Sequence, residues 1–294
     1  MTNASSKHSA IVVVGSLHYD VMVEAPDRPR KGETVSGQRW YPKFGGKGGN
    51  QAVAAARTGV ETRFVGAVGA DDFGEFMRDR LVQAGVALDR VSTIADSDTG
   101  MSVAIIDKDG DYGAVIVSGA NTSIDAEHFN DAALWHGARV LVLQNEIPET
   151  TNIEAAKAAQ QAGVLVCLNA APWREMSDGF LALVDILVVN AIEAEEMAGD
   201  AVTDLPSAKT VAMALTGRVP TVIVTAGGDG VALAARNGAA FSQKAHPVKL
   251  VSTHGAGDTF IGTLASVLAR GGTSERAVSD ANLAAATHVS AKRL

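Results

Sequence analysis

The sequence has little cysteine, no excess of basic residues and no long apolar run, and each absence excludes a class of protein. Its 294 residues include one cysteine, so no disulfide forms within the chain, and Cys167 lies in the apolar run VLVCLN, where a buried, inert thiol is expected. The formal charge is -8, with acids and bases interspersed, which argues against a nucleic-acid partner and a polybasic membrane patch. No segment has the apolar length that crosses a bilayer, and residues 1–10 lack the apolar core of a signal peptide. These absences favour a cytoplasmic protein that binds a small soluble molecule.

The sequence contains instead a rhythm of short apolar runs separated by alanine-rich stretches with helical spacing. Strands that alternate with helices are typical of β-α-β units and a mostly parallel sheet. With 47% hydrophobic residues the chain can bury a large core, so we predict one doubly wound α/β domain over residues 1–294, with helices on both faces of the sheet. The expected strands are 10–16, 62–69, 139–146, 163–170, 185–190 and 221–228. The expected helices are 50–59, 72–84, 149–162, 192–199 and 206–217, with Gly85 and Gly163 as stop signals.

Two segments interrupt this rhythm, residues 18–41 and 99–121, and both alternate apolar with polar side chains. Such alternation is typical of strands with one face on a core and the other in solvent. The sequence KDGDYG at the centre of the second segment is a hairpin turn signal. We therefore predict a small accessory β-sheet that lies over one edge of the main domain as a lid.

Four glycines and a lysine stand in FGGKGGN, residues 44–50, where a helical pattern begins. Glycine lacks a Cβ, so backbone N–H groups can approach a ligand closely, and the positive end of a helix attracts anions. The spacing is not that of a P-loop, because no Ser or Thr follows the lysine, and the G-x-G-x-x-G of dinucleotide-binding folds is missing. The cluster predicts a ligand-binding loop and argues against a dehydrogenase.

A second glycine cluster, THGAGDTF at residues 253–260, places Asp258 at the opening of another helical pattern. In a Gly-Ala-Gly turn at a helix N-terminus, consecutive N–H groups converge on an anion such as phosphate. Asp258 has two interpretations here: it caps the helix, or it is a base beside the phosphate. A cap requires neither flanking glycine, so the pattern favours phosphoryl transfer, which needs N–H donors and a nearby base.

These segments and others occur along nearly the whole chain in an order that resembles the ribokinase-like carbohydrate kinase family, also called PfkB. Within that family, GGKGGNQAVAAARTG (45–59) is most similar to ribokinases. The other segments that carry the resemblance are GSLHYD (15–20), PRKGETVSG (29–37), VGAVGADDFGE (66–75), LQNEIP (143–148), NAAP (169–172), VVNAIEAEE (188–196), TAGGDG (225–230) and GAGDTFIG (255–262). The resemblance implies a ribokinase-like fold and an enzyme that phosphorylates a hydroxyl of a small, ribose-like sugar with ATP and Mg²⁺.

The resemblance also implies a role for each matching residue. Asp258 matches the general base that takes the proton of the acceptor hydroxyl, and the turn of Gly255, Ala256 and Gly257 matches the anion hole for the transferring γ-phosphoryl group. The substrate site is expected to contain Asp20, His18, Gly46, Lys47, Asn50 and Glu146. The nucleotide site is expected to contain Asn190, Thr225, Gly227, Gly230 and Asn282, with Glu193 and Asn190 organising Mg²⁺ through water.

The chain departs from the ribokinase pattern at a few positions. His18 stands where ribokinases usually have Asn, and Tyr19 where they have a small residue, so the sugar pocket is expected to offer different hydrogen bonds and less room. Ser252 stands where the family's potassium site usually draws on an Asp, and the sequence ends at VSAKRL, close to where that site takes carbonyl ligands. These departures argue against activation by K⁺.

Two other functions stay open on the sequence. The acceptor is a nucleoside, such as pseudouridine or a purine nucleoside, if Tyr19 or His18 stacks on or bonds to a base. The chain is a non-catalytic sugar-binding or regulatory relative if it has kept the fold without turnover, although a binder has no need of Asp258. The apolar alternation of YDVMVEA, residues 19–25, predicts that the lid pairs with that of a second copy in a homodimer.

Overall fold

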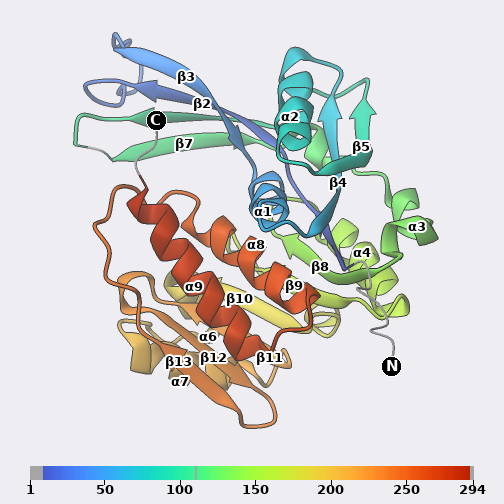
Figure 1. The fold of residues 1–294 in the computed structure, drawn as a ribbon. Helices are drawn as coiled ribbons and strands as arrows, with labels where there is room; N and C mark the ends of the chain where they lie inside the picture. Colours follow the sequence, from blue (N-terminus) through green and yellow to red (C-terminus); the bar gives the residue numbers. More distant parts are fainter. Residues whose placement is uncertain (1–8, 110, 292–294) are drawn as a thin grey trace.

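The computed structural model describes residues 9–109 and 111–291. Within these residues, nine strands form one large sheet in the order β13-β12-β11-β10-β9-β8-β1-β4-β5 (Figure 1). Neighbouring strands from β5 to β11 run parallel, and β12 and β13 add an antiparallel edge. The strands are β1 (Ala10–Val14), β4 (Glu61–Gly69), β5 (Ala87–Ile94), β8 (Ala138–Gln144), β9 (Leu165–Asn169), β10 (Ile186–Asn190), β11 (Thr221–Thr225), β12 (Val231–Ala235) and β13 (Ala240–Gln243).

Helices cover both faces of this sheet and bury two cores. Alternate side chains of a strand point to opposite faces, so Ile11 and Val13 of β1 pack in one core while Val12 and Val14 pack in the other. The first core is covered by α1 (Lys47–Ala56), α2 (Asp72–Gln83), α8 (Ala256–Ala269) and α9 (Ser274–Ser290). The second is covered by α3 (Ala132–Trp135), α4 (Glu149–Gln161), α5 (Asp178–Leu181), α6 (Ala191–Ala198) and α7 (Leu205–Leu215). Short 3-10 turns are η1 (Gly119–Thr122), η2 (Ala126–Asn130) and η3 (Gly227–Asp229).

A second sheet, the lid, stands away from the main sheet (Figure 1). Its order is β3-β2-β6-β7, formed by β2 (His18–Glu24), β3 (Arg39–Gly45), β6 (Met101–Ile106) and β7 (Tyr112–Val117). Strands β2 and β6 are parallel, whereas β2 with β3 and β6 with β7 are antiparallel. The predicted accessory sheet and its hairpin are therefore confirmed.

The lid joins the main domain where four segments of the chain pass from one sheet to the other. Glycines in these segments allow their backbones to pack closely. A Cβ on Gly100 would lie 2.1 Å from Nδ2 of Asn121, and one on Gly46 would lie 2.7 Å from the carbonyl oxygen of Ser16. Asn121 holds Leu17 twice, because its Oδ1 accepts from the Leu17 N–H at 2.8 Å and its Nδ2 donates to the Leu17 carbonyl at 2.8 Å. We call these segments the lid base, residues 15–18, 45–46, 98–100 and 118–121.

Each strand and helix predicted from the sequence is present, within a few residues of its predicted ends. Gly85 and Gly163 follow their helices at φ 78° and 69°, the left-handed region expected of stop signals. Strands β5, β12 and β13 are not among the predicted strands: β5 and β13 are edge strands with partly exposed side chains, and β12 is rich in alanine. Cys167 is buried in β9, where desolvation raises the pKa of its thiol to about 12, so the expected inert thiol is confirmed. None of the helices in the described part of the chain combines the length and the apolar composition that a membrane span requires.

Candidate active site

A cavity of about 830 Å³ lies between the lid and the carboxyl ends of the main-sheet strands. Ligands of open parallel sheets bind at this edge. Residues from distant parts of the sequence meet there, because each β-α unit places the end of its strand at the same edge. The predicted site residues that line the cavity are Asp258, Gly255, Gly257, Asp20, His18, Gly46, Lys47, Asn50, Glu146, Asn190, Thr225 and Glu193.

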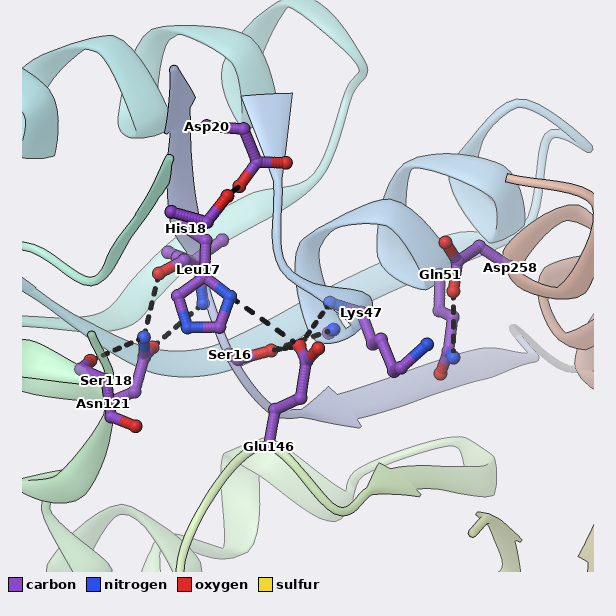
Figure 2. Close-up of polar contacts among 12 residues, drawn as sticks. Ser16, Leu17, His18, Asp20, Lys47, Gln51, Ser118, Asn121, Glu146 and Asp258 are labelled. Atoms are coloured by element: carbon purple, nitrogen blue, oxygen red, sulfur yellow. Dashed lines mark hydrogen bonds and ion pairs between the residues drawn. The ribbon is translucent and has the colours of Figure 1, made fainter. Parts of the chain in front are cut away.

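Glu146 is the centre of a hydrogen-bonded group at the lid end of the cavity (Figure 2). Its Oε2 accepts from Oγ of Ser16 at 2.5 Å and from the backbone N–H of Lys47 at 2.7 Å. Lys47 is the first residue of α1, so the carboxylate also lies at the positive end of that helix. Nδ1 of His18 lies 3.7 Å from the same oxygen, and His18 is 3% exposed, with no protein partner for its Nε2 among the described residues. The carboxylate and the imidazole are thus fixed side by side in the cavity wall.

The glycine-rich loop brings α1 close to the turn between β1 and β2. Gly46 is the N-cap of α1 at φ 84°, a left-handed conformation that glycine adopts without strain. A Cβ on Gly48 would lie 2.5 Å from the backbone nitrogen of Ser16, and one on Gly45 would lie 2.0 Å from Oδ2 of Asp20. The glycines therefore serve close packing that positions the site, in addition to any contact with a ligand.

Asp20 extends from β2 of the lid into the cavity. Its Oδ1 accepts from Oγ of Ser102 at 2.5 Å. Burial raises the pKa of Asp20, and the hydrogen bond from Ser102 is the strongest of the influences that oppose this rise. The carboxylate thus accepts a hydrogen bond from Ser102 and lines the cavity.

Asp258 lies in the first turn of α8 and faces α1. The N-cap of α8 is Gly255, at φ 80°, and no side chain caps the helix. Oδ1 of Asp258 accepts instead from Nε2 of Gln51 at 3.1 Å (Figure 2). Burial raises the pKa of Asp258, and the charge of Lys47 is the main influence that lowers it. The capping interpretation of Asp258 is therefore wrong, and a carboxylate that binds protons more readily than usual lies beside the N-terminus of a helix.

Asn190 and Glu193 form a capping box at the start of α6. The Glu193 N–H donates to Oδ1 of Asn190 at 2.9 Å, and the Asn190 N–H donates to Oε2 of Glu193 at 2.9 Å. Both line the cavity, and burial raises the pKa of Glu193. Carboxylate and amide oxygens are ligands that Mg²⁺ accepts, although the described residues contain no group of three or more Asp, Glu, His or Cys side chains placed to hold a metal ion by themselves. The residues fit an ion that is held largely by water and by the phosphates of a nucleotide.

Some predicted site residues do not line the cavity. Gly227 and Gly230 lie at the turn after β11, where Gly230 has φ 123° and its Cβ would lie 2.1 Å from the carbonyl oxygen of Gln243. Asn282 of α9 donates from Nδ2 to the Lys244 carbonyl at 3.0 Å. Ala256 is the first residue of α8. The structure gives Gly230 and Asn282 packing roles, and their contact with a nucleotide stays a prediction.

The segment before α8 carries no acidic ligand for a cation. The Oγ of Ser252 accepts from the N–H of His254 at 3.3 Å. Residues 251–255 are all described and contain no carboxylate. These residues therefore do not fit the acidic potassium site that the resemblance implies.

Tyr19 does not lie in the sugar pocket, where the sequence predicts it. Residues 18 and 20 face the cavity, so Tyr19 faces the opposite side of the lid. Its ring stacks on Phe73 of α2, with centroids 4.0 Å apart, and contacts the edge of Phe76 at 5.0 Å. Tyr19 therefore neither narrows the pocket nor stacks on a bound base.

The sequence prediction lacks Ser102, which lines the cavity, and Gln51, which donates to Asp258. Gln51 is fully buried and joins two side chains, because its Nε2 also donates to Oδ1 of Asn169 at 3.0 Å. A glutamine within an alanine-rich helical pattern could have indicated this role, because a buried amide needs hydrogen-bond partners. Ser102 has no local signal, since it lies opposite Asp20 only through the pairing of β2 with β6.

The cavity therefore has two ends. Asp20 and Glu146 lie at the lid end, and Asp258 lies beside the N-terminus of α8 at the other end. The family described as pfkB family carbohydrate kinase matches residues 8–293. This chain belongs to the PfkB family of carbohydrate kinases. This PfkB kinase is 34% identical over 284 residues to a ribokinase of Haemophilus influenzae, covering 96% of this chain and 92% of the relative.

Other relatives agree with this assignment. A ribokinase of Mus musculus is 36% identical over 265 residues, which cover 89% of the PfkB kinase and 82% of the relative. The structure of Arabidopsis thaliana ribokinase complexed with ribose and ATP matches with a TM-score of 0.89 and 32% identity, covering 97% of this chain and 94% of the other. The PfkB kinase is therefore an ATP-dependent sugar kinase of the ribokinase type, a phosphotransferase with an alcohol acceptor.

Proposed function

We propose that this kinase transfers the γ-phosphoryl group of ATP to a hydroxyl of ribose or of a sugar of similar size. The observation that carries the proposal is the position of Asp258, whose carboxylate lies at the N-terminus of α8 in the same cavity as Asp20 and Glu146. The Arabidopsis ribokinase of the same fold is complexed with ribose and ATP, which supports this choice of ligands.

The acceptor would bind at the lid end, where polar side chains suit several hydroxyl groups. The carboxylates of Asp20 and Glu146 accept hydrogen bonds from hydroxyls, and Asn50 of α1 both donates and accepts. His18 also lines this end of the cavity, although its Nε2, which has no hydrogen-bond partner among the described residues, is itself buried. The lid excludes water from the cavity when it closes on the sugar, which limits hydrolysis of ATP.

Asp258 would act as the general base. It takes the proton from the acceptor hydroxyl while the hydroxyl oxygen attacks the γ-phosphorus, and the bond from the γ-phosphorus to the bridging oxygen of ADP breaks. The raised pKa of Asp258 makes its carboxylate a better proton acceptor than an exposed aspartate. Backbone N–H groups of Gly255, Ala256 and Gly257, with the positive end of α8, would stabilise the charge on the transferring group.

The nucleotide would extend along the loops after β10 and β11. Thr225 lines the cavity at the end of β11, and Asn190 and Glu193 line it at the start of α6. Mg²⁺, held through water by Asn190 and Glu193, would supply positive charge to the phosphates. Gly227, Gly230 and Asn282 would contact more distant parts of ATP.

A nucleoside is the second candidate acceptor, and His18 is the observation that favours it. Tyr19 packs against α2 on the face of the lid away from the cavity, so of the two residues expected to contact a base, His18 is the one that lines the cavity. A Burkholderia thailandensis nucleoside kinase in complex with inosine shares the fold at 20% identity, which carries no argument about substrate. We therefore place ribose before a nucleoside.

The test is ADP release with a panel of ribose, deoxyribose, hexoses, hexose phosphates and nucleosides. Ribose is expected to give the highest kcat/KM, and Asp258→Asn to lower kcat by at least about 10³-fold while nucleotide affinity changes little. Asp96→Asn, in an exposed turn, is the matched control. Comparable turnover by the Asp258 variant would refute the role of the base, and ligand binding without ADP release from any acceptor would favour a non-catalytic relative.

A further inference from the structure

The loop that leads into α8 is tied to the end of the last helix. The N–H groups of Val251 and Ser252 donate to the carbonyl of Val289, at 2.8 and 3.2 Å. Farther along the loop, Nε2 of His288 lies 3.0 Å from the carbonyl oxygen of His254. The last turn of α9 therefore contacts both the beginning of this loop and the residue before Gly255.

The contact with His288 fixes the direction of one peptide group. A carbonyl oxygen only accepts, so Nε2 of His288 carries the hydrogen of this bond. The carbonyl belongs to the peptide that joins His254 to Gly255. In a trans peptide the C=O and the N–H point in opposite directions, so the Gly255 N–H is aimed away from α9.

The imidazole also packs on the turn itself. Gly255 has φ 80°, and a Cβ at this position would lie 3.0 Å from Nε2 of His288. Gly255 lines the cavity, whereas His288 does not. His288 thus stands behind the turn, on the side away from the ligand.

We propose that His288 is a positioning residue for the anion hole. By holding the His254 carbonyl it aims the Gly255 N–H at the transferring phosphoryl group and keeps the turn in its left-handed conformation. This inference rests on the proposed role of residues 255–257 in phosphoryl transfer. It assigns to the C-terminal helix a part in catalysis that is exerted through the backbone alone.

Kinetics of three variants separate positioning from general stability. His288→Ala should lower kcat about tenfold, the factor that a loss of about 1.4 kcal/mol in the transition state produces. The sugar KM should stay within about twofold, because the sugar end of the cavity is built on β2, α1 and the loop after β8. His288→Gln places an amide N–H at the same distance along the side chain and should restore most of kcat. Thr287→Ala is the control, since its hydroxyl bonds to the Leu283 carbonyl of its own helix.

Hydrogen–deuterium exchange gives a readout that needs no turnover. The amides of residues 253–257 should exchange faster in His288→Ala than in wild type, and His288→Gln should restore their protection. Unchanged exchange in His288→Ala, an unchanged kcat, or equal losses in the alanine and glutamine variants would overturn the inference. A wild-type protein without activity on any acceptor would contradict the proposed function, and the exchange measurement would still decide whether His288 orders the turn.

Discussion

Replacing Ser102 by alanine tests whether Asp20 binds the acceptor as a carboxylate. The change removes the hydroxyl that donates to Asp20 at 2.5 Å. Ser102 is 8% exposed, so bulk water does not readily replace the lost donor. Burial already raises the pKa of Asp20, and Ser102 is the main influence that lowers it. Its loss therefore raises this pKa further and weakens the carboxylate as a partner for a sugar hydroxyl.

The size of the expected loss of sugar affinity follows from the charge of the Asp20 carboxylate, which accepts this hydrogen bond. A hydrogen bond to a charged group contributes about 1.5–3 kcal/mol, which corresponds to roughly 10- to 100-fold in affinity. Because this hydrogen bond exists with and without sugar, the factor is an upper bound on the rise in the sugar KM, reached only at a pH where Asp20 is protonated in the variant and ionised in the wild type. The kcat should change by less than about threefold, because Asp258 and the turn before it are untouched. The sugar binds to the ionised form, so affinity is lost as the pH falls through the pKa of Asp20. A higher pKa moves this loss to higher pH.

Steady-state ADP release at several pH values measures these quantities. Ser97→Ala is the control, because its hydroxyl bonds to the Asp98 carbonyl in an exposed turn. A sugar KM that is unchanged in the Ser102 variant, or a fall in kcat with KM intact, would refute the reasoning that Asp20 is a sugar ligand.

Three further predictions concern the base, the cation and the assembly. Gln51→Leu removes a donor that lowers the pKa of Asp258, so the acid limb of the kcat profile should move to higher pH, and kcat at pH values below this limb should fall by up to about tenfold; an unshifted limb contradicts this. Exchange of Na⁺ for K⁺ should alter kcat by less than about twofold, because Ser252 offers no charge, and marked stimulation would show that a cation site exists. Val115 and Val117 of the edge strand β7 are 69% and 53% exposed, so light scattering should give a homodimer that Val115→Lys dissociates, whereas a monomeric wild type rejects the dimer.

The fold is largely predictable because the central strands are buried on both faces. Strand β1 has no exposed residue, and its run of valines marks it without reference to the rest of the chain. The edge strands lack such a signal: in β5, polar and apolar residues mix, since one side has no neighbouring strand. The lid is predictable for the opposite reason, because its strands alternate polar with apolar side chains.

The site is predictable only where its residues stand in local motifs. Asp258 follows a glycine cluster and Glu146 stands at the end of a strand, so both have a local signal. The position of Ser102 depends on the register of two strands that are far apart in sequence. The position of Tyr19 follows from strand geometry alone, because side chains of a strand alternate and residue 19 cannot share a face with His18 and Asp20. The role proposed for His288 could not be predicted from the sequence, because nothing near this residue shows which loop the last turn of α9 contacts.

The lid base sets a limit on how the acceptor preference of this kinase can be changed. His18 lies inside it, within a contact network that also contains Ser16, Leu17 and Asn121 and in which added side chains have no room. A substitution there would alter the attachment of the lid together with the recognition of the sugar. Positions farther along the lid strands, such as Met22 and Ile116, line the same cavity away from the lid base. Redesign towards a larger acceptor therefore has more freedom at the outer end of the lid than at its root.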